Sequence, residues 1–255
     1  MFRVLAPKIS VMFWEENTKI KTDSLEFRRF LAEQILLPEN KWDKRFKQYV
    51  QQKENDLLQE IPKRNFEEEQ EWDFQRYLKS LDLKKQDLIN KKILDLGCGE
   101  GEFVKYCLGH GISEDVYGLD VQLEVEEINP GFRKYFLKGN FEEELPIKEL
   151  DYIISVIAID APNSEEIERD IRKILVLVLM AMKIDGEARI FPVRKTGAIT
   201  GLRTIEFSWK KWIEVLQDLA NKKLINYEFK PIDIGVAGNK PDVWLEQVLI
   251  IKKRH

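Results

Sequence analysis

Residues 93–101 read ILDLGCGEG, an apolar run followed by a turn that holds three glycines. The apolar part has the length and composition of a buried strand, and glycines allow backbone to lie close to a ligand. A dinucleotide-binding turn spaces its glycines as G-x-G-x-x-G, and Glu102 stands where its third glycine would be. A carboxylate in the first turn of a helix competes with phosphate for the positive helix end. The stretch therefore predicts a strand, a ligand-binding turn and a helix, with a ligand other than a pyrophosphate.

Strand-like and helix-like runs alternate from residue 91 to the end of the chain. This alternation predicts an α/β fold in which helices cover both faces of a mostly parallel sheet. The last two strand-like runs flank the turn-rich DIGVAGNKPD and predict an antiparallel hairpin. Residues 174–182 are apolar throughout, and we assign them to a helix because Ser164 and the glutamates after it are typical of a first helical turn. The expected strands are KKILDLG, DVYGLD, YFLKGNF, LDYIISVIAID, EARIFPV, INYEFKPI and VWLEQVLIIKK, and the expected helices are GEFVKYCLGHG, VQLEVEEI, SEEIERDIRKILVLVLMAM and SWKKWIEVLQDLANKKL.

The first 90 residues carry helical signals only. Asp23 and Glu26 have the spacing of a capping box, and apolar residues recur at helical intervals after them. A later amphipathic run begins at Asn65 with a glutamate three residues on. We therefore predict two parts, a helical N-terminal cap over residues 1–90 and an α/β domain over residues 91–255.

Composition and charge exclude several classes of protein. With 255 residues, of which 44% are hydrophobic and 34% charged, the chain fits a soluble globular protein. Its longest apolar run is far shorter than the roughly 18 residues of a membrane span, and no secretory signal begins it, so we expect a cytoplasmic protein without membrane contact. Basic residues number 17 against 17 acids up to residue 90 and 24 against 28 beyond it, so neither part attracts nucleic acid strongly. The two cysteines, Cys98 and Cys107, predict neither a disulfide scaffold nor a metal site.

Taken with the acids on either side of its glycines, ILDLGCGEG resembles the first motif of class I S-adenosylmethionine-dependent methyltransferases. The ligand in that family is a sulfonium nucleoside without phosphate. The resemblance covers about residues 91–255 and implies a Rossmann-like sheet of seven strands, mostly parallel, with the last strand antiparallel. It also implies S-adenosylmethionine as the cofactor and methyl transfer as the reaction.

The resemblance assigns the residues that bind the cofactor. Asp95 supplies negative charge near the amino group, and Gly97 and Gly99 let the backbone lie against the ligand. Asp120 follows at about the interval at which an acid accepts hydrogen bonds from both ribose hydroxyls. The neighbours of these residues complete the expected contacts along both strand ends, namely Leu96, Cys98 and Val121.

Two further stretches resemble the family at the expected places. KGNFEEELP resembles the loop that contacts adenine, with Asn140 where an acid is more usual and Phe141 placed to pack against the ring. The run DYIISVIAID resembles the fourth strand, so its end, from Ser155 to Asp160, is expected beside the reactive methyl group, with Ser155 and Val156 as cofactor contacts. Simple strand core is an equally good interpretation of Ser155, Val156 and Ile157.

For the residues that would bind or activate the methyl acceptor, the sequence leaves several interpretations open. Asp160 is the best candidate for a general base by position, although Asp and Pro in DAPN also form ordinary turns. Arg194 and Lys195 open the expected loop RKTGAITGLRT and are candidates to bind an anionic group of the acceptor, with solvated surface as the alternative. Five basic residues at 41–53 suggest RNA contact, but a solvated helix face is the better interpretation.

We therefore expect a methyltransferase that acts on a small molecule. The alternatives are an RNA or protein methyltransferase and a nonenzymatic module that binds adenosylmethionine or a nucleotide. The signature (N/D)PP(Y/F) is typical of enzymes that methylate amino groups of bases or glutamine. DAPN does not reproduce it, which argues against those acceptors. An NAD-dependent oxidoreductase ranks last, and the sequence leaves the oligomeric state undetermined.

Overall fold

The computed structural model describes residues 66–159, 170–196, 203–232 and 244–254, together with residues 30, 34, 41, 43–48 and 51. Most of the predicted N-terminal cap lies outside these residues, and so does Asp160.

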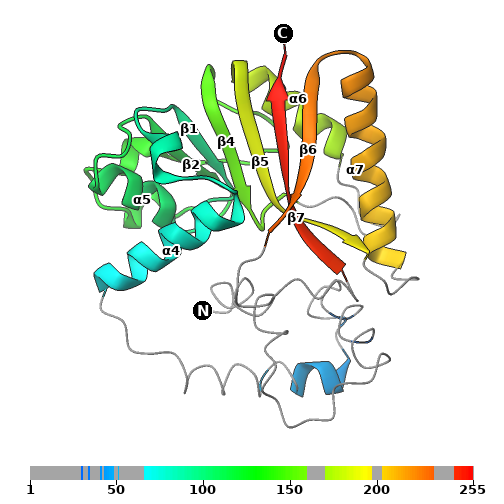
Figure 1. The fold of residues 1–255 in the computed structure, drawn as a ribbon. Helices are drawn as coiled ribbons and strands as arrows, with labels where there is room; N and C mark the ends of the chain where they lie inside the picture. The colour runs from blue at the N-terminus through cyan, green and yellow to red at the C-terminus, as the bar shows by residue number, and fades with distance from the viewer. Residues whose placement is uncertain are drawn as a thin grey trace.

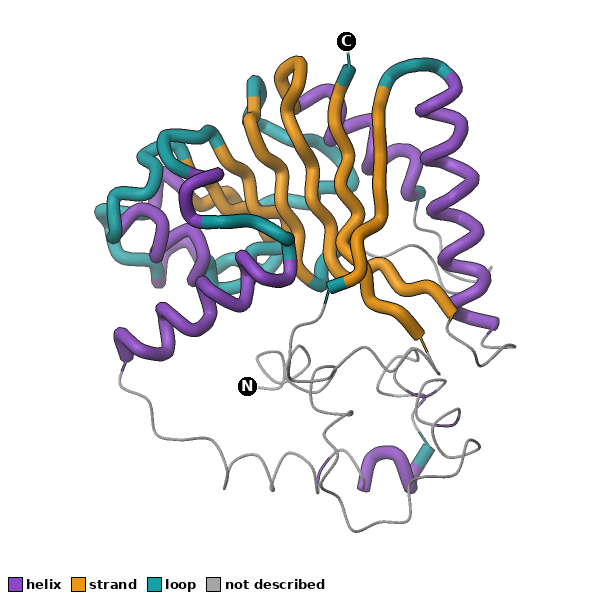
Figure 2. The backbone as a smooth tube through the Cα atoms, in the orientation of Figure 1, coloured by secondary structure: helices purple, strands orange, loops and turns teal. Residues whose placement is uncertain are grey.

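A seven-stranded sheet with the order β3-β2-β1-β4-β5-β7-β6 forms the centre of the structure (Figures 1 and 2). The strands β3, β2, β1, β4 and β5 pair in parallel, whereas β7 runs antiparallel between β5 and β6. The predicted fold class and the C-terminal antiparallel hairpin are therefore confirmed. The strands are β1 (Ile93–Leu96), β2 (Val116–Asp120), β3 (Phe136–Lys138), β4 (Leu150–Val156), β5 (Met182–Thr196), β6 (Ile225–Pro231) and β7 (Trp244–Lys253).

Helices cover both faces of the sheet, as the alternating sequence predicts (Figure 1). On one face, α6 and α7 bury Leu175 and Trp212 in a core shared with the strands. On the other face, α4 and α5 bury Phe74 and Phe103 in a second core. The α-helices are α4 (Phe66–Ser80), α5 (Glu102–Gly109), α6 (Ile171–Ala181) and α7 (Arg203–Asn221), and the short 3-10 helices are η2 (Lys85–Leu88), η3 (Val125–Glu127) and η4 (Arg133–Tyr135).

Two expected helices need comment. The apolar run at residues 174–182 is helical up to Ala181, and the side chain of Asp170 caps α6 by accepting a hydrogen bond from the Lys173 N–H at 3.0 Å. The expected helix VQLEVEEI is wrong, because only the single 3-10 turn η3 forms there. Its buried side chains, Leu123 and Ile128, are not spaced for one helical face.

The last helix of the predicted cap packs directly on the α/β domain. In α4, the ring of Phe74 stacks on Tyr106 of α5 with centroids 4.2 Å apart. After α4, the carbonyl oxygens of Leu81 and Asp82 accept hydrogen bonds from Arg189 of β5 at 2.9 and 2.6 Å. Residues 66–90 therefore share the core of the domain, and the division at residue 90 stays a prediction. Within the described part of the chain, no helix is both long enough and apolar enough to span a membrane.

Candidate cofactor site

The glycine turn begins where β1 ends, beside the carboxyl ends of β2 and β4. Its three glycines all have positive φ values, 72°, 57° and 78° in chain order, a region that other L-residues rarely adopt. Their N–H groups already have protein acceptors, which leaves none of the three free to hold a phosphate. The acceptors are the carbonyl oxygen of Leu119 for Gly97, the carboxylate of Asp120 for Gly99 and the carbonyl oxygen of Cys98 for Gly101, at 2.7, 3.0 and 2.9 Å.

The three glycines serve different purposes. A Cβ atom added to Gly97 would lie 2.0 Å from the Cβ of Ala158, so this glycine lets the segment after β4 approach the turn. A Cβ atom on Gly101 would lie 2.0 Å from the ring of Phe136 on β3. Only at Gly99 does a Cβ meet nothing within 4 Å, and this glycine is exposed. Gly99 is thus the glycine of this turn that presents bare backbone to an outside ligand.

Asp95 lies at the carboxyl end of β1 and is completely buried, with 0% of its surface exposed. Neither carboxylate oxygen has a hydrogen-bond partner of good geometry among the described residues. Burial raises the pKa of Asp95 to about 8, although interaction with the Tyr77 hydroxyl acts in the opposite direction. A buried carboxyl without a donor is costly unless a ligand satisfies it, and a cationic group suits it best.

Asp120 ends β2 and faces the same turn. Its Oδ2 accepts a hydrogen bond from the Gly99 N–H at 3.0 Å, and its Oδ1 accepts one from the Gln122 N–H at 2.8 Å. A carboxylate has about four acceptor positions, so two remain for the vicinal hydroxyls of a ribose. The neighbouring Val121 is 60% exposed, an unusual position for a large apolar side chain and one compatible with ligand contact.

The loop after β3 brings its two predicted residues to different positions. Phe141 is half-buried and its Cε1 lies 3.9 Å from the position of a Cβ on Gly97, so its ring borders the glycine turn. Asn140 is exposed, and its Oδ1 accepts a hydrogen bond from the Glu142 N–H at 2.9 Å, which stabilises the local turn. The structure therefore places Phe141 against the candidate site and Asn140 at its outer edge.

The predicted residues of β4 are mainly buried. Ser155 has 0% exposure, and its hydroxyl donates a hydrogen bond to the carbonyl oxygen of Leu96 at 3.0 Å, which ties β4 to β1. Val156 is 9% exposed, and Leu96 and Cys98 are buried as well. These four side chains belong to the strand core that supports the site.

Ile157, which the sequence placed at the end of the fourth strand, has a backbone conformation that was not predicted. It follows β4 with a φ of 66°, a strained value for a β-branched side chain, and it remains 38% exposed. Its N–H donates a hydrogen bond to the carbonyl oxygen of Phe191 at 2.6 Å, which holds the strained backbone against β5. No sequence signal marks such a conformation at an isoleucine.

The candidate acceptor-binding residues lie in a strand, because β5 continues to Thr196. Arg194 pairs with Glu246 of β7 at 3.1 Å, and their side chains are only 14% and 15% exposed. Lys195 is exposed, with its Nζ 5.4 Å from the ring centroid of Trp209. The first residues of the predicted loop therefore belong to β5, where Arg194 links β5 to β7 through its ion pair with Glu246. Asp160, the candidate base, lies outside the described residues.

Tyr77 of α4 is a further residue near the glycine turn, and its helix lies outside the stretch that resembles the family. Its ring stacks on Phe103 of α5 with centroids 5.1 Å apart. Burial and then the charge of Asp95 raise the pKa of Tyr77 well above its usual value. The Tyr77 hydroxyl in turn acts to lower the pKa of Asp95. The α4 helix thus contributes a polar group to the candidate site.

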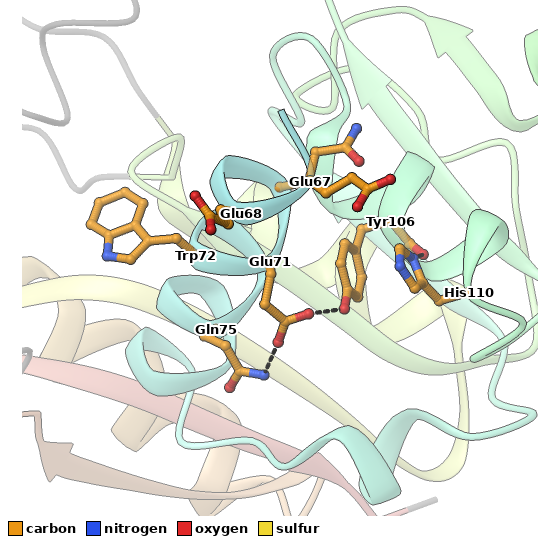
Figure 3. Close-up of a pocket in the computed structure, with 8 residues that line it drawn as sticks. Glu67, Glu68, Glu71, Trp72, Gln75, Tyr106 and His110 are labelled. Atoms are coloured by element: carbon orange, nitrogen blue, oxygen red, sulfur yellow. Dashed lines mark hydrogen bonds between the residues drawn. The ribbon is translucent and has the colours of Figure 1, made fainter. Parts of the chain in front are cut away.

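A surface hollow between α4 and α5 lies apart from this site (Figure 3). In it, the hydroxyl of Tyr106 donates a hydrogen bond to Glu71, and Gln75 donates one to the same carboxylate at 2.7 Å. His110 stacks on Tyr106 at the end of α5, opposite the end that meets the glycine turn. The hydrogen bond from Tyr106 to Glu71 joins the two helices, whereas the one from Gln75 lies within α4, and the residues that line the hollow include none of the predicted cofactor contacts.

Residues 76–199, just under half of the chain, match the family model described as FtsJ-like methyltransferase. No curated protein matches the chain. A solved structure of Haemonchus contortus phosphoethanolamine N-methyltransferase 2 with S-adenosylhomocysteine is 16% identical, covers 72% of this chain and 52% of its own, and has a TM-score of 0.46. Human N-acetylserotonin methyltransferase with S-adenosylmethionine is 14% identical, with coverage of 72% and 52% and a TM-score of 0.44.

The chain spans about half the length of these two proteins, and both similarities are too distant to carry an argument about its substrate. The family match spans the glycine turn, Asp95 and Asp120. It agrees with S-adenosylmethionine as the expected cofactor and with methyltransferase as the expected enzyme class. Residues 76–199 are therefore similar to FtsJ-like methyltransferases, and the described residues form a mostly parallel seven-stranded sheet of the expected fold class.

Proposed function

We propose that this protein transfers the methyl group of S-adenosylmethionine to a small-molecule acceptor. The observation that carries the proposal is the buried carboxyl of Asp95, whose oxygens have no hydrogen-bond partner of good geometry among the described residues. Asp95 precedes the exposed backbone of Gly99 by four residues. The cofactor's ammonium group matches the carboxyl, and its ribose matches the free acceptor positions of Asp120. Phe141 would then pack against the adenine ring.

In this reaction the protein aligns the methyl acceptor with the cofactor. The sulfonium of the cofactor supplies an electrophilic methyl group, so the protein must place a nucleophile in line with it and exclude water. Ile157 suits this role because its exposed apolar side chain follows β4, the strand expected beside the methyl group. An acceptor that enters as a protonated or hydroxyl group needs a base, for which Asp160 stays our candidate.

Charge around the site favours a small acceptor over RNA. Three segments follow β1, β2 and β3, namely residues 97–101, 121–135 and 139–149. Together they hold eight glutamates and three basic residues. Phosphates of a nucleic acid would be repelled by such a surface, whereas a neutral or cationic molecule would not. The glutamates are Glu100, Glu124, Glu126, Glu127, Glu142, Glu143, Glu144 and Glu149, and the basic residues are Arg133, Lys134 and Lys148.

Transfer of a radiolabelled methyl group to fractionated cell extract tests this proposal. We expect label in the small-metabolite fraction, and we expect the Asp120→Ala variant to transfer far less. Lys210→Ala, which changes an exposed residue of α7, is the matched control for the proposed cofactor contacts. Label in RNA or protein instead would replace the small-molecule acceptor by one of those classes. Binding of S-adenosylhomocysteine without transfer to any fraction would indicate a nonenzymatic module.

A further inference from the structure

The surroundings of Asp95 contain no compensating charge. The interactions that act on its carboxyl come from the hydroxyl of Tyr77 on α4 and the carboxylate of Asp120 on β2. The charge of Asp95 also contributes, after burial, to raising the pKa of two thiols, those of Cys98 in the glycine turn and Cys107 on α5. None of these described groups is a cation, and a second carboxylate opposes ionisation of the first.

Backbone donors do not supply the missing hydrogen bonds either. Turns and helix ends often stabilise a carboxylate through their N–H groups. Here the glycine N–H groups donate elsewhere, to Leu119, to Asp120 and to Cys98. Apart from the Tyr77 hydroxyl, no group among the described residues stabilises the negative charge of the Asp95 carboxyl, which is 0% exposed and has no hydrogen bond of good geometry at either oxygen.

We propose that Asp95 is protonated while the cofactor site is empty and releases its proton to solvent when the ammonium group of the cofactor binds. The inference rests on the proposed cofactor binding and adds a proton to it. The neutral acid and the ammonium ion become a carboxylate paired with that ammonium ion, and the buffer takes up the proton. Binding therefore depends on pH through a group of the enzyme.

Proton release is measured by calorimetry of S-adenosylhomocysteine binding at pH 7 in buffers with different heats of ionisation. S-adenosylhomocysteine carries the ammonium group of the cofactor without a transferable methyl group. With a folded-state pKa of about 8 for Asp95, we expect release of about 0.9 proton per site at pH 7. The same linkage makes affinity increase almost tenfold between pH 6 and pH 7. 5′-Methylthioadenosine, which lacks the amino acid part, should bind without releasing a proton.

Variants distinguish proton release by Asp95 from a purely structural role of its carboxyl. Asp95→Asn should bind S-adenosylhomocysteine without proton release and with an affinity that does not follow pH over this range. Tyr77→Phe removes the interaction that favours ionisation, so it should shift the pH of half-maximal release upward. Glu100→Gln, an exposed acid in the same turn, should release as much as the wild-type protein.

The outcomes also separate this inference from the proposed function. Binding of S-adenosylhomocysteine without proton release by the wild-type protein would overturn the inference and leave the cofactor assignment intact. Equal release by the wild-type protein and Asp95→Asn would overturn it as well. Failure of the folded wild-type protein to bind S-adenosylhomocysteine would overturn both.

Discussion

The carboxylate of Asp120 accepts a hydrogen bond from the backbone N–H of Gly99 at 3.0 Å. This contact joins the carboxyl end of β2 to the glycine turn after β1, across 21 residues of sequence. The acid expected to bind the ribose therefore also shapes the backbone expected to lie against the cofactor. Substitutions at Asp120 are expected to have two separable effects.

Asp120→Ala should lower affinity for S-adenosylhomocysteine at least tenfold and destabilise the fold by about 1–2 kcal/mol, because Gly99 loses its acceptor. Asp120→Asn keeps an oxygen for Gly99, so it should recover much of the stability while affinity stays reduced. Calorimetry and urea unfolding measure the two effects. Wild-type affinity in both variants would contradict the ribose assignment.

Alanine at the glycines should separate packing from ligand binding. Both Gly97→Ala and Gly99→Ala force a side chain into a left-handed conformation, which costs about 1–2 kcal/mol. Gly97→Ala adds a clash with Ala158 and should cost about 1–3 kcal/mol more. Gly99→Ala should stay folded and lose affinity for S-adenosylhomocysteine. The order of stability in urea unfolding checks this prediction, and the reverse order would refute it.

Ser155→Ala should act on stability more than on cofactor binding. Its hydroxyl donates to the carbonyl oxygen of Leu96 in a fully buried position, and its loss should cost about 1–2 kcal/mol in urea unfolding. Affinity for S-adenosylhomocysteine should change less than threefold. A large loss of affinity at unchanged stability would restore Ser155 as a direct cofactor contact.

Arg194→Ala should destabilise the sheet, because it leaves Glu246 mostly buried without this partner. Breaking a fully buried pair costs about 3–5 kcal/mol, and the partial exposure here should reduce that to about 2–3 kcal/mol. Arg194→Met with Glu246→Leu removes both charges and should recover most of the loss. If Arg194→Ala is as stable as wild type and raises only the KM for an acceptor, the acceptor-binding role stands instead.

Asp95 should make stability depend on pH. Its pKa rises from about 3.9 in the unfolded chain to about 8 in the folded protein. The folded state therefore holds the proton more tightly, and stability falls as pH rises between these values, by up to about 1.4 kcal/mol per pH unit. Asp95→Asn removes this contribution. Urea unfolding of both proteins at pH 5, 6, 7 and 8 should show a difference that changes with pH, and parallel curves would contradict the prediction.

Local pattern predicted most of the fold. The strand runs and the helices α5, α6 and α7 follow from apolar periodicity and turn residues, which act over a few neighbours in sequence. The helix predicted for VQLEVEEI does not form. Its apolar residues are compatible with a helix, but tertiary packing buries only Leu123 and Ile128. The length of β5 was underestimated, since pairing with β7 extends it through Arg194 to Thr196.

Residue types and short spacings were sufficient to predict the glycine turn and the acids on either side of it. The role of each residue in the turn depends on contacts between distant segments. The tertiary structure assigned Gly97 and Gly101 to close packing and left Gly99 open, and it buried Asp95 without a donor. Burial and hydrogen-bond partners arise from segments far apart in the chain, so no local pattern contains them.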